Sequence, residues 1–392
     1  MSKQEEKLRS SNSNSNSNAE VSTSGQRLHF ASTFPGGSHT EDNSEDAYDI
    51  GSCSSGQITL YMVADGHGGP EGRHAAQLAC HESLLWTVRY AAMFPQWFKA
   101  GALDRQIDML FASIHNKFRT EMHTRTRGSI ITPQGRVVSS YGVPVRGGTT
   151  LTCVWVFTYE GMRIIHTANV GDSEAMLIRL SGGDASRPRH TLLTTEHSPS
   201  NQNEYRRVML DFIKPMWMVY DLPQQSDKCR CPLIYKPIPA DEATDVKSDL
   251  RHQQYVTDPW GNGLSPKNIR YDPAVYAVAP CGGHAIAVTR ALGDFNMHEY
   301  GMISLPSHNV EHLEPDESCM ICIASDGLWD CWTYADFAQY MTARMGDVNS
   351  TIQSVVTHAM DATKTVAVAN FGRGYDDTTL VAVHLSPLTD SL

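Results

Sequence analysis

The sequence predicts an α+β fold, with antiparallel sheets packed on each other and helices on the outside. Three observations support this prediction. Short apolar runs rich in β-branched residues occur in groups, and turn residues bound each run. Stretches with apolar residues at helical spacing separate and follow these groups. The chain has 392 residues, of which 41% are hydrophobic, so it is long enough to bury the core that such layers require.

The predicted strands and helices alternate in blocks along the chain. The strands are bounded by Gly, Asp or Ser and cover residues 58–63, 151–157, 163–168, 175–180, 320–324 and 379–385. The first helix covers about residues 71–92. The second carries an apolar stripe made by Leu103, Ile107, Leu110, Phe111, Ile114 and Phe118. A late helical region covers residues 334–344 and 350–367.

Three stretches fall outside this pattern. Residues 1–25 are polar and rich in alternating Ser and Asn, which predicts a disordered tail before a folded domain at 26–388. Residues 127–146 are polar and contain Gly and Pro, as in a long hairpin or loop. Residues 212–280 contain many prolines and show little periodicity, which predicts an insertion. Such an insertion either has a functional use or is a tolerated surface excursion.

Composition excludes several classes of protein. The net charge of −11 argues against general binding to nucleic acid or to an anionic membrane. No apolar run approaches the roughly 20 residues that span a bilayer, and the N-terminus lacks the apolar region of a secretory signal. Nine scattered cysteines, an odd number, indicate reduced thiols, so we expect a cytoplasmic and/or nuclear protein. We also expect it to be a monomer.

Acidic residues mark the ends of several predicted strands. Asp65-Gly66 follows the strand at 58–63, and Asp326-Gly327 follows an apolar run at 320–323. Each end presents a carboxylate and a backbone carbonyl, and the glycine permits a close approach to a ligand. Two such ends brought together form an oxygen pocket for hard divalent cations. Metal-assisted hydrolysis of a phosphate ester is the chemistry that this pocket suggests.

Two further acidic positions support a shared site. Asp46 precedes a short strand, and Asp376 precedes the last strand. Any single aspartate of this kind is more often a turn or helix cap, but several acidic strand ends in one chain favour a common pocket. His67 could protonate a departing alkoxide, or it could be a metal ligand or a packed histidine. The neighbourhood lacks the histidine spacing typical of zinc sites.

A series of short motifs then gives a specific resemblance. They are Ser-Glu-Asp-Ala (44–47), Val-Ala-Asp-Gly-His-Gly-Gly (63–69), Gly-Gly-Thr-Thr (147–150), Ala-Asn-Val-Gly-Asp-Ser-Glu-Ala (168–175), Leu-Thr-Thr-Glu-His-Ser-Pro (193–199), Ser-Asn-Gln-Asn-Glu-Tyr-Arg-Arg (200–207), Ala-Val-Thr-Arg-Ala-Leu-Gly-Asp-Phe (287–295), Ser-Asp-Gly-Leu-Trp-Asp (325–330) and Asp-Asp-Thr-Thr (376–379). In this order, over about residues 28–386 with an interruption at 212–280, the chain resembles the metal-dependent type 2C serine/threonine protein phosphatases, the PPM family.

The resemblance implies a four-layer α-β-β-α sandwich with two central antiparallel sheets and a metal pair in a cleft at one end. It also implies two Mg²⁺ or Mn²⁺ ions and, as in some relatives, a third and weaker ion. Asp65 would bridge the pair, and His67 would be the general acid. The other implied ligands are the Gly66 carbonyl, Asp326 and Asp376, Glu45 and Asp46 directly or through water, and Asp172 and Asp330 for the third ion.

The implied reaction is hydrolysis of phosphoserine and phosphothreonine in protein substrates. A metal-activated water attacks phosphorus in line, and no covalent intermediate is needed. Oxygen-only ligands suit Mg²⁺ or Mn²⁺ better than Zn²⁺. The main alternative is a pseudophosphatase that keeps the fold as a binding or regulatory module. An aspartyl-phosphate phosphatase would need an Asp-x-Asp-x-Thr motif after its first strand, which the sequence does not contain.

The chain departs from the family at the substrate side of the site. Glu41 stands where the family has a phosphate-binding arginine, so we expect weaker phosphate binding and a raised KM. Arg73 is a candidate replacement, although it could equally be a solvated helix residue. Glu174 replaces a common arginine, and Asp377 replaces an asparagine, which adds negative charge near the metals. The 212–280 segment follows the motif at 200–207, which resembles the family's flap, so we expect it to shape substrate choice.

Two cysteine pairs were weighed as metal or redox sites. Cys319 and Cys322 lie on a predicted core strand, where their side chains would point to opposite faces and pack in the core. Cys229 and Cys231 lie in the 212–280 segment, where redox sensitivity is a minor alternative.

Overall fold

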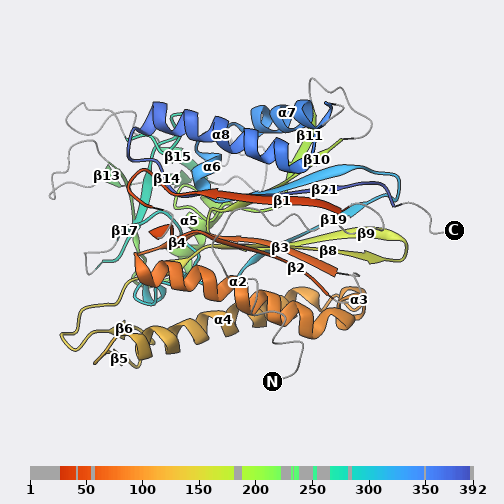
Figure 1. Cartoon of the computed structure of the whole chain (residues 1–392). Helices are drawn as coiled ribbons and strands as arrows, with labels where there is room; N and C mark the ends of the chain where they lie inside the picture. Colours follow the sequence, from red (N-terminus) through yellow and green to blue (C-terminus); the bar gives the residue numbers. More distant parts are fainter. Residues whose placement is uncertain are drawn as a thin grey trace.

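Two five-stranded antiparallel sheets form the centre of the molecule (Figure 1). The computed structural model describes residues 27–40, 43–53, 58–180, 188–221, 231–232, 234–237, 250–253, 265–280, 285–347 and 350–388. The first sheet has the order β1 (Arg27–Phe34), β21 (Thr378–Leu385), β20 (Cys319–Ala324), β10 (Glu174–Arg179) and β11 (Arg189–Leu192). The second has the order β19 (Ser307–Leu313), β9 (Met162–Val170), β8 (Leu151–Tyr159), β3 (Ile58–Ala64) and β2 (Ala47–Ser52).

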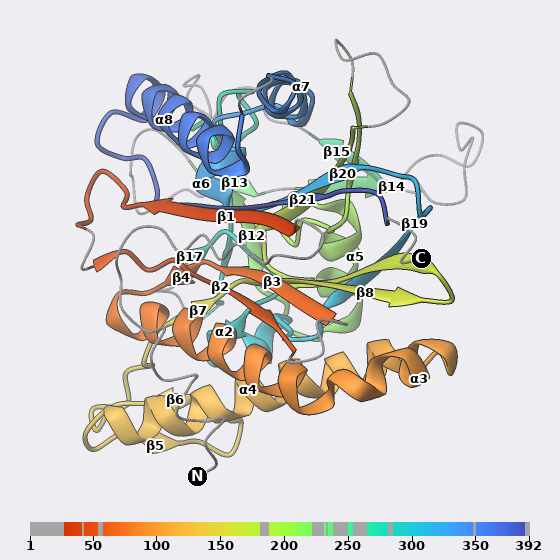
Figure 2. The ribbon, with the colours of Figure 1, turned by 45° about the vertical axis from the view of Figure 1, so that its right-hand side comes forward.

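Helices cover the outer face of each sheet, as Figures 1 and 2 show. The second sheet is covered by α2 (Pro70–Tyr90), α3 (Phe94–Lys99) and α4 (Leu103–Arg125), with the short η3 (Ala91–Met93) between α2 and α3. The first is covered by α7 (Tyr334–Met345) and α8 (Ile352–Phe371). This layering confirms the predicted α-β-β-α sandwich of the α+β class.

The interior consists of three apolar layers. Residues such as Tyr61, Ile165 and Ile321 fill the space between the two sheets. Trp155 and Phe111 belong to the layer between the second sheet and its helices, and Phe337 belongs to the layer on the other side. Alternation along β20 sends Cys319 into the layer between the sheets and Cys322 into the layer under α7 and α8. Both thiols are free and buried, which confirms the core-packing prediction.

In the two five-stranded sheets, three strands that sequence patterns did not predict lie at the edges. β1, β11 and β19 are each the last strand of their sheet. β19 has the sequence Ser-His-Asn-Val-Glu-His-Leu and is mostly half-buried. Edge strands are exposed along one side and tolerate polar residues, so they lack the apolar run that marks a central strand. Residues 127–146 contain the predicted hairpin as the short strands β5 (Ile130–Ile131) and β6 (Val137–Val138).

The 212–280 segment contains short strands, contrary to its aperiodic sequence. β12 (Trp217–Tyr220) pairs with β13 (Cys231–Pro232) and with β16 (Val275–Val278), which in turn pairs with β17 (Ala285–Ile286). A separate pair joins β14 (Ile234–Pro237) to β15 (Leu250–Gln253). Met218 and Tyr220 pack in one cluster with Val208 of α5 (Gln202–Asp211). The segment is therefore tied into the domain next to the predicted flap.

Some predictions concern residues that the structure does not describe. The tail at 1–25, Glu41 and Cys229 all lie outside the described residues. Among the described helices, none has the length and apolar character to cross a membrane.

Candidate metal centre

Aspartates from both sheets meet at one end of the sandwich. Asp65 follows β3, Asp172 follows β9, Asp376 precedes β21, and Asp326 begins the one-turn helix α6 (Asp326–Trp329) directly after β20. Asp46, just before β2, accepts a hydrogen bond from Ser325 Oγ at 2.8 Å, which joins the two sheets here. We call the following set the acidic centre: Asp46, Asp65, Asp172, Asp326, Asp330 and Asp376.

The backbone around Asp65 is packed so tightly that only glycine fits after it. The Asp65 N–H donates to Thr150 Oγ1 at 3.0 Å, and its carbonyl accepts from the Thr150 N–H at 2.8 Å. A Cβ on Gly66 would lie 2.6 Å from the Gly72 carbonyl and 2.7 Å from Glu45 O, closer than real contacts allow. The Asp-Gly motif thus places one carboxylate and an adjacent backbone carbonyl at the centre.

Burial and mutual repulsion dominate the electrostatics of the acidic centre. Burial raises the pKa of Asp65 well above its usual value, and the charges of Asp46 and Asp326 add to the effect. For the same main reason, burial, the pKa of Asp46 and that of Asp330 rise to about 7, and those of Asp326 and Asp376 also rise. These carboxylates lack enough positive charge for their number.

Two oxygens of the acidic centre have no partner at all. Asp46 Oδ1 and Asp326 Oδ1 are buried and form no hydrogen bond. Buried polar atoms are costly unless they bind something. A set of crowded carboxylates with raised pKa values, two of whose oxygens are buried without a hydrogen bond, fits hard divalent cations such as Mg²⁺ and Mn²⁺, which take oxygen ligands.

A lysine from the 212–280 segment enters this centre. Lys267 Nζ lies 3.2 Å from Asp172 Oδ2, 3.7 Å from Asp326 Oδ2 and 3.8 Å from Glu196 Oε1. Burial acts to lower the pKa of Lys267, but the charges of the surrounding carboxylates, Asp172 first, raise it well above its usual value. Its ammonium therefore stays protonated beside the residues implied as ligands of a third ion. Nothing in the sequence marked this lysine.

The turn that carries Lys267 is docked onto the other side of the centre. The Ile269 N–H donates to Asp330 O at 3.0 Å. Arg270 Nη1 donates to the carbonyls of Trp329 at 2.9 Å and Trp332 at 2.6 Å, just after α6. These bonds fix the position of the ammonium relative to Asp326 and Asp330.

His67 lies beside the acidic centre and is paired with a buried aspartate. Its Nε2 lies 2.6 Å from Asp294 Oδ2, and Asp294 is fully buried. Burial acts to lower the pKa of His67, but the charge of Asp294 and this hydrogen bond raise it. The pair favours an imidazolium that can donate a proton. Asp294 belongs to a motif found in the sequence, but its partnership with His67 was not predicted.

Asp294 is held by a short three-stranded sheet. β4 (Gly66–His67) pairs with β7 (Gly148–Thr149), which pairs with β18 (Leu292–Gly293). The Asp294 N–H donates to Gly147 O at 3.0 Å. On the outer side, His115 Nδ1 accepts from the Gly293 N–H at 3.2 Å, and His298 Nε2 lies 2.9 Å from Gly293 O. These two histidines therefore support the strand that positions Asp294.

Asp377 has a different environment from its neighbour Asp376. Its Oδ1 accepts from the Gly36 N–H at 2.6 Å and lies 3.0 Å from His39 Nδ1. Its Oδ2 accepts from the Glu45 N–H at 2.6 Å. Asp377 thus ties the segment that carries Glu45 to the last strand, and His39 offsets its charge. Both oxygens of Asp377 are therefore engaged by groups of the chain itself.

Arg73, the candidate replacement for the family arginine, lies next to the segment that carries Glu45 and Asp46. Its Nε donates to Ser44 O at 2.9 Å, so the guanidinium lies beside the backbone that leads to Glu45 and Asp46. Glu174, the other departure from the family, is buried and accepts a hydrogen bond from the Tyr334 hydroxyl. Burial raises the pKa of Glu174 to about 8.

The predicted flap contains a buried charge with a full set of partners. The Glu204 carboxylate accepts hydrogen bonds from Arg290 Nη2 at 2.6 Å, Arg207 Nη2 at 2.8 Å and Thr289 Oγ1 at 2.8 Å. Burial acts to raise the pKa of Glu204, but the hydrogen bonds from the two arginines lower it to about 2. We call these four residues the Glu204 cluster.

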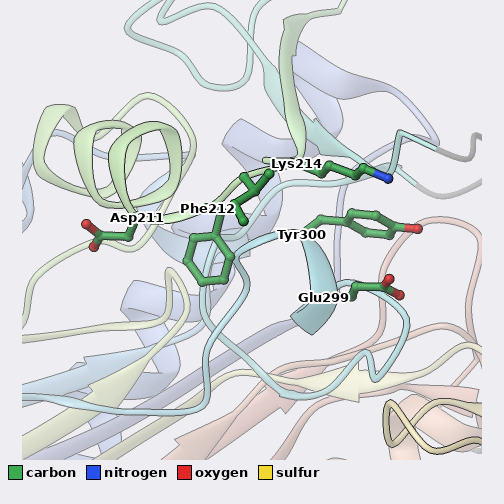
Figure 3. A pocket seen from close by; sticks show the side chains of 6 residues that line it. Asp211, Phe212, Lys214, Glu299 and Tyr300 are labelled. Atoms are coloured by element: carbon green, nitrogen blue, oxygen red, sulfur yellow. The ribbon is translucent and has the colours of Figure 1, made fainter.

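A hollow of about 420 Å³ lies where α5 ends, next to η4 (His298–Tyr300), as Figure 3 shows. Its lining residues are Asp211, Phe212, Ile213, Lys214, Glu299 and Tyr300. No residue of the acidic centre is among them, so this hollow and the acidic centre are separate features.

Comparisons with known proteins agree with this architecture. A family model described as protein phosphatase 2C matches residues 30–211 and 281–368. A serine-threonine phosphatase 2C from Toxoplasma gondii is 15% identical with a TM-score of 0.56, and the match covers 93% of this chain and 97% of that one. A sex-determining protein of C. elegans is 18% identical with a TM-score of 0.53, and covers 94% of this chain and 66% of that one. A comparison with curated protein sequences finds no match.

Proposed function

Since the chain belongs to the protein phosphatase 2C family of serine/threonine phosphatases, we propose that it hydrolyses phosphoserine and phosphothreonine in proteins at a centre of two Mg²⁺ or Mn²⁺ ions. The observation that carries this proposal is the acidic centre, in which crowded carboxylates have raised pKa values and two buried oxygens form no hydrogen bond. A set of oxygens in this condition is stabilised by bound cations.

The residues that would hold the two ions are Asp65, Asp326, Asp376 and Asp46, together with the Gly66 carbonyl and Glu45. When bound, the ions would supply a nucleophilic water of lowered pKa and would neutralise charge on the phosphoryl oxygens. Asp172 and Asp330 are the residues implied for a third ion. Because Lys267 already contacts Asp172, a third ion would have to displace its ammonium.

Residues of the chain supply the rest of the proposed chemistry. His67, held by Asp294, would donate a proton to the leaving oxygen of the serine or threonine. Asp377 would keep Glu45 in place through its backbone N–H. Arg73, bonded to Ser44 O, is the group best placed to hold the substrate phosphate in place of the family arginine.

The 212–280 segment would act on substrate choice from its place beside the flap. It packs against α5 and carries Lys267 into the centre. Deletion of residues 222–262 should change kcat/KM among phosphopeptides of different sequence. Identical kinetics on all of them would remove this part of the proposal.

The decisive experiment is hydrolysis of p-nitrophenyl phosphate and of a phosphothreonine peptide with Mn²⁺ or Mg²⁺, with and without EDTA. We expect activity that EDTA abolishes and that falls about 1000-fold in Asp65→Asn and Asp326→Asn, because each removes a charge that holds the ions. Activity that survives EDTA and both substitutions would refute the proposal.

The same experiment separates the alternative of a catalytically weak binding module. Lys267 in the acidic centre and Glu41 in place of an arginine are the observations that favour it. That alternative predicts binding of a phosphothreonine peptide without turnover, even at saturating Mn²⁺.

A further inference from the structure

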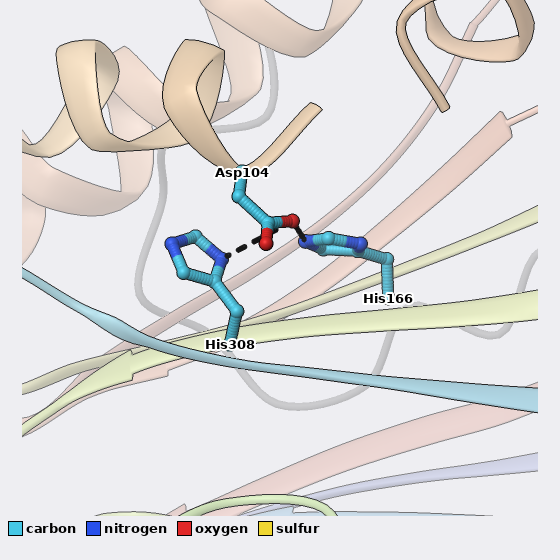
Figure 4. A group of neighbouring side chains, drawn as sticks. All are labelled: Asp104, His166 and His308. Atoms are coloured by element: carbon cyan, nitrogen blue, oxygen red, sulfur yellow. Dashed lines mark ion pairs between the residues drawn. The ribbon is translucent and has the colours of Figure 1, made fainter. Parts of the chain in front are cut away.

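A second cluster of ligand-type side chains lies away from the acidic centre. It consists of Asp104 in the first turn of α4, His166 on β9 and His308 on β19 (Figure 4). One ligand atom from each residue lies within 4.8 Å of the other two. His166 Nε2 is 3.5 Å, and His308 Nδ1 is 4.0 Å, from the same atom, Asp104 Oδ1.

The pairing of two strands places the histidines on one face. In the antiparallel ladder of β9 and β19, Val310 lies opposite His166 and His308 lies opposite Ala168. The two histidines are therefore diagonal neighbours, and their ring centroids are 5.6 Å apart. Asp104 reaches them from the helix layer, as Figure 4 shows.

His166 is buried without satisfying either ring nitrogen. The residue is 0% exposed, and neither Nδ1 nor Nε2 forms a hydrogen bond. His308 Nδ1 is likewise buried without a hydrogen bond. His166 Nε2 and His308 Nδ1 both face the Asp104 carboxylate without a hydrogen bond to it, so these nitrogens are available to a ligand that lies between the three side chains.

The orientation of His308 is fixed by another carboxylate. Its Nε2 lies 2.9 Å from Asp108 Oδ1, one helical turn after Asp104. This bond leaves Nδ1 facing Asp104 and His166. A carboxylate bound to the far nitrogen of a histidine is the usual partner of metal-binding histidines, since it fixes the tautomer and the ring.

The separations suit a small transition-metal ion. Two ligand atoms on a tetrahedral zinc ion, each at about 2.0–2.1 Å from the metal, are roughly 3.4 Å apart. The observed separations from Asp104 are 3.5 and 4.0 Å, and the three ligand atoms lie within 4.8 Å of one another, so side-chain adjustments would bring them to this distance. Asp104 has 59% of its side chain exposed, so an ion and its water ligands can enter from solvent.

We propose that Asp104, His166 and His308 form a second metal site, which binds Zn²⁺ or a similar borderline ion through two imidazoles and one carboxylate. Water would complete the coordination. The ligand set differs from the oxygen-only acidic centre, and imidazole favours zinc over magnesium. Because the site joins α4 to two strands of the second sheet, the bound ion stabilises the contact between these layers. The proposal is independent of phosphatase activity.

The test is calorimetric titration of the full chain with Zn²⁺ in excess Mg²⁺, which would occupy the acidic centre. We expect one strongly bound Zn²⁺ per chain in the wild type and in the Asp65→Asn, Asp326→Asn double variant. Binding should weaken at least about 100-fold in His308→Ala and in Asp104→Asn, and about 10-fold in Asp108→Asn, which positions His308. The matched control is His312→Ala, an exposed histidine on the same strand.

Several results would overturn the site. The first is that the wild type does not bind Zn²⁺. The second is that His308→Ala and Asp104→Asn bind Zn²⁺ as tightly as the wild type does. The third is that only the Asp65→Asn, Asp326→Asn double variant loses Zn²⁺ binding. Asp104 is exposed, so Asp104→Asn tests the site even where His308→Ala folds poorly. The visible spectrum of bound Co²⁺ gives an independent readout, which should show tetrahedral nitrogen and oxygen ligands in the wild type and lose them in Asp104→Asn.

Discussion

The carboxylates of the acidic centre and the carboxylate of the Glu204 cluster have opposite electrostatic environments. Glu204 receives hydrogen bonds from two arginines and a threonine, and its pKa falls to about 2. In the acidic centre the pKa of Asp65 rises well above normal, and Asp46 and Asp326 each keep an oxygen without a partner. Burial acts to raise the pKa of the carboxylates in both regions, so burial alone does not explain the difference.

The supply of cations is what separates the two regions. Arg207 and Arg290 are close enough to match the single charge of Glu204. Among the described residues, Lys267 is the cation that forms ion pairs with members of the acidic centre, and it cannot balance all of them. Where a carboxylate serves structure, the chain provides its counter-charge. Where counter-charge is missing, we infer that an ion from solution provides it.

The largest expected effect is on stability, and it comes from the Glu204 cluster, where the carboxylate has a full set of partners. Glu204→Ala should lower the free energy of unfolding by about 3 kcal/mol, because it leaves two half-buried guanidinium groups without their carboxylate. Chemical denaturation of the purified variant measures this. Glu121→Ala removes a carboxylate with surface ion pairs and should change stability by about 1 kcal/mol or less. Equal effects of the two substitutions would break the comparison.

The next effect is a dependence of stability on pH that comes from His298, which contacts the strand that positions Asp294. Burial lowers the pKa of His298 to about 4, against about 6.5 in an unfolded chain. As the pH falls below about 6.5, His298 takes up a proton in the unfolded state but not yet in the folded state. The free energy of unfolding that this histidine contributes above pH 6.5 is therefore lost progressively as the pH approaches 4. At pH 4.5 the loss from this residue should be about 2 kcal/mol.

His298→Gln keeps a donor for Gly293 O and removes the titration. Its unfolding free energy should therefore fall less steeply between pH 6.5 and 4.5 than that of the wild type. The exposed His312→Gln is the control and should keep the wild-type slope. A slope in His298→Gln that matches the wild type would count against a neutral buried His298.

A smaller effect, on the affinity for Mn²⁺, tests whether Lys267 competes with metal ions in the acidic centre. Lys267→Met should raise the affinity for Mn²⁺ about tenfold, since an ammonium 3.2 Å from Asp172 no longer competes. The same variant should be less stable than the wild type in EDTA. Calorimetry with Mn²⁺ measures the first effect and thermal melting the second. Weaker Mn²⁺ binding in Lys267→Met would show that the lysine supports the metals instead of opposing them.

The smallest expected effect concerns the phosphate. Arg73→Ala should raise KM for a phosphothreonine peptide about fivefold with little change in kcat, because it removes charge that binds ground and transition states alike. Glu41→Arg should lower KM and partly rescue Arg73→Ala. No improvement in kcat/KM from Glu41→Arg would remove the idea that this position limits phosphate binding.

Sequence patterns predict the acidic residues at the strand ends of the site, but they do not predict which side chains pair with the site residues. Asp65 and Asp326 each follow a fully buried strand, and the glycine after each is a local signal. Lys267 pairs with Asp172 across 95 positions of sequence, and His67 pairs with Asp294 across 227. No local periodicity reports such pairs, because they depend on how the sheets and the 212–280 segment pack.

The strands show the same difference: some can be predicted from their own residues, and others are defined only by the strand they pair with. Central strands such as β8 are continuous apolar runs, so their position follows from the sequence. Edge strands such as β19 are polar and half-buried, and only their neighbour defines them. His308 lies on β19, so the cluster with Asp104 and His166 could be found only after that strand was placed.

Lys267 has a consequence for how the protein responds to its surroundings. The turn that carries it is anchored by Ile269 and Arg270, so the ammonium is a tethered competitor whose effective concentration at Asp172 does not change with the medium. Free Mg²⁺ or Mn²⁺ competes with this ammonium, so the apparent Kd of the ion at this part of the centre is higher than it would be without the lysine. We therefore expect the ion concentration at half occupancy to be raised by a constant factor, which is set by a residue 95 positions from the ligand it contacts.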